Sequence, residues 1–307
     1  MLLGGGWGND GDDGVAQRTL ATAFETGVRF IDTAGVYGDG ASERPIGRFL
    51  ESHRDAGLVV ATKLGRAGIC PDGYTRASLR EATERSLERL GVDSLDLTQL
   101  HCVPTEVLRA GHVFDWLREL QQEGLIRRWG ASVELVEEGM ICRDQPELAS
   151  LQIIFNIFRQ KPAAQLLPRA AAQGVGIIVR LPLASGLVGG KITRATTFRD
   201  DDHRNFNRDG AMFNVGETFA GLPLDTGIAA TEQVAALVPE NLTMAQVALR
   251  WILDHEAVSV VIPGASRPEQ VRANVGAAAV APLPEALHAA LAAIYRDGVH
   301  DAIRGPY

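Results

Sequence analysis

Short apolar runs alternate with longer amphipathic stretches along most of the chain. Residues 28–32 (VRFID) have the pattern of a buried parallel strand, because β-branched and aromatic residues fill a short run that an acid closes. Ser42 is expected to cap the next helix, since its hydroxyl can accept a hydrogen bond from a first-turn N–H. Strands are predicted at residues 28–32, 58–62, 95–100, 126–131, 148–155, 176–181 and 258–262. Helices are predicted at residues 13–26, 43–52, 75–90, 113–123, 135–141, 163–173, 243–255, 267–278 and 285–295.

Strands that alternate with helices in this way predict βαβ units and a parallel sheet. Seven or eight such units in 307 residues favour an α/β fold of the (β/α)8 TIM barrel type, as a single domain over residues 1–307. A doubly wound sheet is the alternative, and it requires a GxGxxG turn directly after its first strand. Residues 4–8 are rich in glycine but have the wrong spacing for that turn.

The predicted barrel has an unusual beginning and one long irregular segment. Residues 1–3 are too few for a normal strand, so the first strand is predicted to be truncated or missing. We therefore expect strands 28–32 and 258–262 to face each other across a gap or an incomplete pairing. Residues 184–225 follow the seventh strand and combine charged residues with four phenylalanines, which predicts a long lid loop over the barrel mouth.

The composition excludes several classes of protein. A net charge of -8 argues against a nucleic-acid partner, which requires a basic surface. Three cysteines without a CxxC spacing predict reduced thiols, and Cys102 is interpreted as a core residue. The sequence has neither an apolar run of membrane-spanning length nor a leader-like opening. We expect a cytoplasmic protein that binds neither nucleic acid nor membrane.

Ionisable side chains stand at the ends of consecutive predicted strands. Asp32, Lys63 and His101 each close a strand, and Tyr37 lies in the glycine-rich loop that follows Asp32. In a barrel of parallel strands these ends surround one mouth, which is where barrel enzymes carry their catalytic residues. The four side chains are therefore predicted to lie together in an active site.

The residue types indicate a proton transfer to a carbonyl oxygen. A neighbouring ammonium is expected to lower the pKa of the Tyr37 phenol, while Asp32 keeps Lys63 charged. A neutral His101 can orient a carbonyl oxygen, and Tyr37 can serve as a general acid. A single histidine without a paired ligand predicts no metal site. The set has no nucleophile and requires an electron source, which implies a hydride cofactor.

Three motifs carry a resemblance to a known family. Residues 29–47 (RFIDTAGVYGDGASERPIG), 61–63 (ATK) and 97–101 (LTQLH) resemble, in order and spacing, the catalytic motifs of the aldo-keto reductases. The resemblance covers nearly the whole chain. It implies a catalytic tetrad of Asp32, Tyr37, Lys63 and His101, and NADPH-dependent reduction of an aldehyde or ketone to an alcohol. The proton would come from Tyr37 and the hydride from the nicotinamide.

The same resemblance implies the positions that hold NADPH. Ser132 and Gln152 correspond to ligands of the nicotinamide carboxamide, although Val133 stands where the family usually has asparagine. Arg180 stands where the family often stacks an aromatic ring on the nicotinamide. The helix start after the last strand offers free N–H groups and a positive dipole end to a phosphate. The remaining predicted cofactor residues are Pro182, Leu183, Ser185, Gly186 and Leu187 at the pyrophosphate, and Gly264, Ser266, Arg267, Gln270 and Asn274 at the adenosine phosphate.

Two functions are open at this stage. The first is an NADPH-dependent reductase of a small carbonyl substrate, which the intact tetrad favours. The second is a regulatory or sensor subunit that binds NADPH with little turnover, which the short first strand favours. Neither the physiological substrate nor the oligomeric state follows from the sequence.

Overall fold

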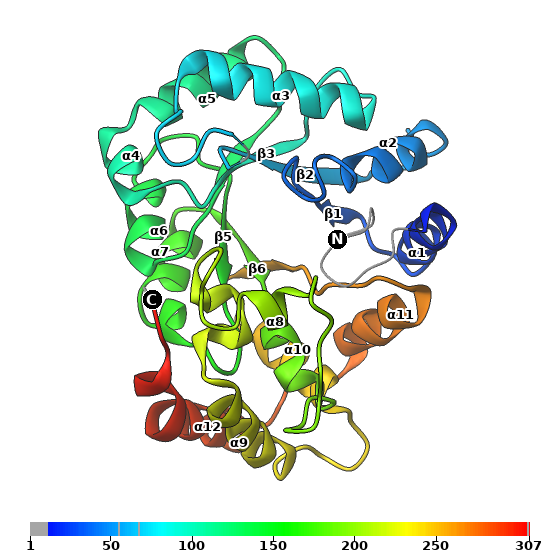
Figure 1. Cartoon of the computed structure of the whole chain (residues 1–307), viewed down its shortest axis with the longest axis vertical. Helices are drawn as coiled ribbons and strands as arrows, with labels where there is room; N and C mark the ends of the chain where they lie inside the picture. Colours follow the sequence, from blue (N-terminus) through cyan, green and yellow to red (C-terminus); the bar gives the residue numbers. More distant parts are fainter. Residues whose placement is uncertain (1–11, 55, 67, 306) are drawn as a thin grey trace.

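A computed structural model describes residues 12–54, 56–66, 68–305 and 307. Its seven parallel strands pair in sequence order and curve into a nearly closed barrel with the helices outside (Figure 1). Sequential order excludes the doubly wound alternative, in which the strand order reverses. The strands are β1 (Phe30–Asp32), β2 (Val59–Leu64), β3 (Leu97–His101), β4 (Trp129–Ser132), β5 (Ser150–Ile154), β6 (Gly176–Arg180) and β7 (Val258–Val261).

The helices confirm the predicted alternation with strands and add three that were not predicted: α4, α8 and α9. Helix α9 escapes prediction because it contains Gly227, which weakens the helical pattern. A Cβ at Gly227 would lie 2.7 Å from Leu187, so close packing requires glycine there. The helices are α1 (Asp13–Glu25), α2 (Glu43–Glu51), α3 (Arg76–Leu90), α4 (Thr105–Ala110), α5 (His112–Gln122), α6 (Val136–Arg143), α7 (Leu166–Ala172), α8 (His203–Phe206), α9 (Leu224–Ala235), α10 (Met244–Leu253), α11 (Pro268–Gly276) and α12 (Glu285–Ile294).

The expectation of a gap between strands 28–32 and 258–262 concerns the two edges of the sheet. Within the described residues, β1 and β7 are the two edges of the sheet and do not pair with each other. Helix α1 packs beside α11 across this seam (Figure 1), where Ala23 contacts Ala265 and Val271 in a small apolar cluster. The expectation for residues 1–3 lies outside the described residues.

Two local details differ from the sequence prediction. Ser42 does not cap α2; its hydroxyl instead accepts a hydrogen bond from Thr33 at 2.9 Å, inside the turn that follows β1. In β7 the register against β6 shifts between Ile177 and Ile178, which leaves Ser259 as an extra residue. The Ser259 hydroxyl accepts from the Ile177 N–H at 3.2 Å, so the irregularity leaves that donor satisfied.

The segment after β6 lies over the carboxyl ends of the strands, as predicted for a lid. It has no long helix before α9, and its buried Phe219 packs on Phe198 with ring centroids 5.8 Å apart. Arg304, in the tail after α12, donates to the Gly221 carbonyl at 3.1 Å and so ties the segment to the C-terminal tail. No helix within the described residues is long and apolar enough to cross a membrane.

Candidate active site

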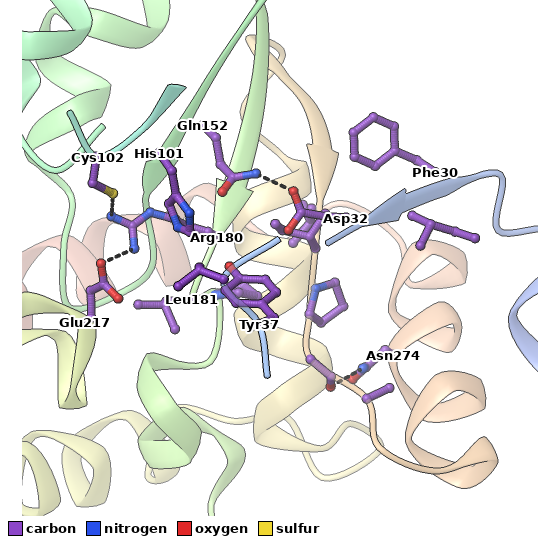
Figure 2. Close-up of a pocket in the computed structure, with 18 of the residues that line it drawn as sticks. Phe30, Asp32, Tyr37, His101, Cys102, Gln152, Arg180, Leu181, Glu217 and Asn274 are labelled. Atoms are coloured by element: carbon purple, nitrogen blue, oxygen red, sulfur yellow. Dashed lines mark hydrogen bonds and ion pairs between the residues drawn. The ribbon is translucent and has the colours of Figure 1, made fainter. Parts of the chain in front are cut away.

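The ends of β1, β2 and β3 bring the predicted tetrad together. Lys63 Nζ donates to Asp32 Oδ2 at 2.5 Å and lies 3.4 Å from the Tyr37 hydroxyl. The Tyr37 ring meets the His101 ring edge to face, with centroids 5.8 Å apart. Lys63 also donates to the Thr33 carbonyl at 2.9 Å, which fixes its ammonium between the carboxylate and the phenol. Figure 2 shows Tyr37, His101 and Asp32 around one cavity.

Buried charge holds the loop that carries Tyr37. Glu43 at the start of α2 is fully buried, and it accepts from Thr62 and from Arg89 at 2.5 Å each. The Arg89 side chain lies so close to Gly40 that a Cβ there would be 2.3 Å from it, and Gly40 also has a φ of +79°. Only glycine meets both requirements. The loop is therefore fixed on α3 as well as on the barrel.

The charge states expected for Lys63 and His101 agree with the structure, whereas the pKa shift expected for Tyr37 does not. Burial opposes the charge on Lys63, but Asp32 and Tyr37 together outweigh it, and the pKa of the ammonium lies above its ordinary 10.5. Burial lowers the pKa of His101 well below 6.5, and Lys63 and Arg66 act in the same direction, so the imidazole is neutral. The expected lowering of the Tyr37 pKa is wrong. Burial raises it above 10 and outweighs the opposing effect of Lys63.

Two consecutive hydrogen bonds connect the predicted nicotinamide position to Asp32. Ser132 donates to Gln152 Oε1 at 3.1 Å, and Gln152 Nε2 donates to Asp32 Oδ1 at 2.7 Å. Gln99, which lies beside Lys63 in the register of β2 and β3, also donates to Asp32 Oδ1 at 3.4 Å. All these groups are buried. Asp32 is thus held by three side chains, and one of them also belongs to the predicted cofactor site.

The tetrad opens into a cavity of about 1230 Å³. The cavity runs from Tyr37 and His101, past Arg180, to Asn274 in α11 (Figure 2). Pro182 and Gly264 also line it. An elongated dinucleotide has to reach from the reacting carbonyl to an anchoring site for its phosphates. The cavity joins the two regions that the sequence predicts for the ends of such a cofactor.

At the far end, the predicted adenosine-phosphate residues surround the start of α11. Gln270 Oε1 accepts from the Ser266 N–H at 2.8 Å and from its hydroxyl at 3.1 Å. Asn274 donates to the Gly264 carbonyl at 3.3 Å, and Arg267 is the residue that precedes the helix. These bonds hold the segment before α11 against the helix, whose first N–H groups are of the kind that can bind an anion. Their contact with a cofactor stays a prediction.

The predicted pyrophosphate loop is partly packed into the protein. Pro182 lines the cavity, whereas Leu187 is fully buried in the core. Ser185 donates to the Glu217 carbonyl and accepts from the Phe219 N–H, both at 3.1 Å, and so ties this loop to the lid. Leu183 and Gly186 lie in the same turn, where Gly186 has a φ of +100°. Contact between these residues and a pyrophosphate stays a prediction.

The Arg180 guanidinium is held by contacts to neighbouring residues and does not present an exposed planar face to the cavity. Its guanidinium donates to the Val133 carbonyl at 3.2 Å, meets Glu217 at 3.3 Å and lies 3.7 Å from the Cys102 sulfur. Cys102, interpreted from the sequence as a core residue rather than a ligand, is of intermediate burial and lines the cavity. Burial raises the pKa of its thiol to about 12, and the thiol is therefore neutral.

Sequence reasoning missed the polar and charged residues that accompany Arg180. Arg66, Glu134, Asn214 and Glu217 line the same cavity, and none was predicted as a site residue. Arg66 follows β2 by two residues and Glu134 follows β4 by two, so proximity to strand ends was an available signal. Glu217 lies in the lid, 151 residues from its partner Arg66, and no local pattern indicates that contact.

Comparison with known proteins gives the family. Residues 1–296 match the Aldo/keto reductase family, and the chain belongs to it. The chain is 30% identical over 293 residues to an NADH-specific methylglyoxal reductase of Escherichia coli, covering 90% of this chain and 86% of that protein. It is 29% identical over 306 residues to a probable voltage-gated potassium channel subunit beta of Arabidopsis thaliana, covering 91% and 87%.

Solved structures agree with the fold. A glycerol dehydrogenase, AKR11B4 of Gluconobacter oxydans, superposes with a TM-score of 0.76 at 29% identity, over 100% of this chain and 92% of that one. An aldo-keto reductase of Klebsiella pneumoniae in complex with NADPH superposes with a TM-score of 0.63 at 24% identity, over 91% and 86%. The chain is therefore an oxidoreductase-family barrel with the tetrad residues at its mouth.

Proposed function

We propose that this protein reduces the carbonyl group of a small aldehyde or ketone to an alcohol, with NADPH as its cofactor. The observation that carries the proposal is the buried contact series from Asp32 through Lys63 to the Tyr37 hydroxyl, at 2.5 and 3.4 Å, beside a neutral His101. The cavity, the Ser132 hydroxyl and the Gln152 amide fit a nicotinamide nucleotide in size and polarity. When bound, a reduced nicotinamide would supply the hydride.

The side chains of the tetrad would handle the proton. Tyr37 holds its phenolic proton at neutral pH, because burial raises its pKa, and it is the group that would donate to the carbonyl oxygen. The Lys63 ammonium stabilises the phenolate that forms, and Asp32 keeps that ammonium charged. The neutral His101 would donate a hydrogen bond to the same oxygen, which directs the carbonyl toward Tyr37.

The test is NADPH oxidation by the purified protein against a panel of aldehydes, ketones and sugars, followed by absorbance. Turnover that disappears in Tyr37→Phe supports the proposal. Absence of turnover with every carbonyl, in a protein that still binds NADPH, would refute it. NADH is assayed in parallel, because the E. coli relative is named as NADH-specific.

A second function has one observation in its favour, which is the likeness to a probable potassium channel beta subunit. On this alternative the protein binds NADPH and serves as a sensor with little turnover. Tight NADPH binding together with negligible reduction of the whole panel would favour it. The complete and closely spaced tetrad is the reason that we prefer the enzyme.

A further inference from the structure

One wall of the cavity beside Tyr37 and His101 is charged. Arg66 meets Glu134 at 2.9 Å and Glu217 at 3.4 Å, and Arg180 meets the same Glu217 oxygen at 3.3 Å. The four residues come from the loops after β2 and β4, the end of β6 and the lid. We call Arg66, Glu134, Arg180 and Glu217 the charged wall. Figure 2 shows Arg180 and Glu217 next to His101.

The charged wall is largely withdrawn from water. The Arg180 and Glu217 side chains are only 11% and 13% exposed, and those of Arg66 and Glu134 are 24% and 20% exposed. Arg180 Nε is buried and donates to no acceptor in the described part of the chain. Binding costs free energy when a ligand covers such polar groups without offering them hydrogen bonds. The wall therefore selects against an apolar substrate.

Charge balance indicates which polar substrate the wall fits. Each guanidinium already faces a carboxylate. Burial opposes ionisation of Glu217, but Arg180 and Arg66 outweigh it and hold its pKa below the usual range. An anionic substrate would have to approach the ionised Glu217 and compete with it for both arginines. A neutral hydroxyl can donate to a carboxylate oxygen and accept from a guanidinium without disturbing the ion pairs.

The same arrangement argues against a metal ion at this position. The Cys102 sulfur and one oxygen each of Glu134 and Glu217 lie within 4.8 Å of one another, which is a spacing that metals use. The two guanidiniums already pair with these carboxylates. Burial also keeps the Cys102 thiol protonated, whereas a metal ligand has to be a thiolate.

We propose that the charged wall is a subsite for the hydroxyl groups of a short, uncharged hydroxy-aldehyde or hydroxy-ketone. The proposal rests on the proposed reductase function. Tyr37 and His101 would bind the carbonyl oxygen, while Arg66, Glu134 and Glu217 bind hydroxyls on the adjacent carbons and Arg180 holds Glu217 in place. The charged wall determines specificity and takes no part in the proton transfer.

The test compares two aldehydes of the same shape. Glyceraldehyde and 2-methylbutanal differ only in two hydroxyls that replace two methyl groups. We expect kcat/KM for glyceraldehyde to exceed that for 2-methylbutanal by about tenfold or more, because a site that hydrogen-bonds hydroxyls rejects the analogue that lacks them. Equal values, or a preference for 2-methylbutanal, would overturn the subsite and leave the reductase function intact. A higher kcat/KM for the anionic glyoxylate than for glyceraldehyde would also overturn it.

The variant that links this preference to the charged wall is Arg66→Met with Glu134→Leu. It removes an ion pair as a unit, so that neither charge of that pair is left alone, and such replacements are often tolerated. The ratio of the two kcat/KM values should shift toward 2-methylbutanal by about tenfold. The matched control is Arg109→Met with Glu137→Leu, because this exposed pair on α4 and α6 lies outside the cavity. An unchanged ratio in the wall variant, or an equal shift in the control, would contradict the proposal.

A second variant and a binding measurement complete the test. If circular dichroism shows that the double variant does not fold, Glu134→Gln replaces it, with the same direction expected. Calorimetric titration with glycerol and with 2-methylbutan-1-ol, in the presence and absence of NADP⁺, tests the subsite without turnover. Preferential glycerol binding in a protein that reduces no carbonyl would refute the proposed function and retain the subsite. Equal or no binding of both alcohols would refute the subsite.

Discussion

Replacing Asp32 with asparagine tests the contact series on which the proposed reaction depends. The substitution keeps the size of the side chain and removes its charge. Asp32 is buried, and its two oxygens contact Lys63 at 2.5 Å and Gln152 at 2.7 Å. The ammonium of Lys63 would be left in the barrel without a counter-ion. Because the pair is withdrawn from water, its loss should affect both stability and activity.

The stability effect can be estimated from the burial of the pair. Removing one partner of a buried ion pair costs about 3–5 kcal/mol of unfolding free energy. Asp32 raises the pKa of Lys63 above 10.5, so this contribution is fully present below pH 10.5 and is lost only as pH rises through the folded-state pKa. The variant should therefore be destabilised throughout the neutral range. Thermal denaturation at pH 7 should show a Tm lower by about 5–15 °C.

The activity effect follows from the charge on Lys63. Without the carboxylate, burial is no longer outweighed and the pKa of the ammonium falls. At pH 7, kcat should be lower by about a hundredfold, and the remaining activity should decline as pH rises through mildly alkaline values. NADPH oxidation measured from pH 6 to 9 gives both results. The wild type should show no loss from Lys63 over that range.

The control is Asp39→Asn, on the same loop as Tyr37 but exposed to solvent. Asp39 has a φ of 52°, a conformation that asparagine also tolerates, so stability and kcat should be unchanged. Asp32→Asn with a wild-type Tm and an unshifted pH profile would show that Asp32 does not hold the charge on Lys63. A loss of similar size in Asp39→Asn would show instead that the loop is sensitive to any change.

Three further predictions concern individual residues. Tyr37→Phe should remove carbonyl reduction and keep NADPH affinity within about twofold, because only the proton donor is lost. Turnover assays measure the reduction and fluorescence titration measures the affinity. Near-wild-type turnover would show that another group is the acid. Arg267→Ala should weaken NADPH binding about tenfold more than NADH binding, since a forked guanidinium contact to the 2′-phosphate is lost; equal losses for both cofactors would contradict this. His101 should be neutral at pH 6.5 and above, because its pKa lies well below 6.5, so kcat should show no acid limb near 6.5, and His101→Gln should not alter the profile there.

The position of the tetrad could be predicted because it depends on topology and periodicity. Asp32, Lys63 and His101 each close an apolar run, and parallel strands bring such ends to one mouth whatever their exact register. Tyr37 follows because the loop after β1 is short. These are consequences of the βαβ repeat, which is visible in the chain as alternating apolar and amphipathic segments.

The electrostatics could not be predicted in the same way. An ammonium beside Tyr37 does lower the pKa of the phenol, but burial acts in the other direction and is larger. Only the structure shows how deeply the hydroxyl is buried, so only the structure decides the sign. The charged wall is a similar case, because Glu217 reaches Arg66 and Arg180 from a lid whose path follows no periodic pattern.

Backbone strain at the mouth connects the fold to the site. Cys102 and Leu181 directly follow His101 and Arg180, and both have a φ near +50°, which costs non-glycine residues about 1–3 kcal/mol. Each strained turn is held in place: the Cys102 N–H donates to the Ser132 carbonyl at 2.8 Å, and Asn156 donates to the Leu181 carbonyl at 2.9 Å. A relaxed turn at either position would redirect the chain that leaves the strand. The strain is therefore located where a polar side chain at a strand end has to face the cavity.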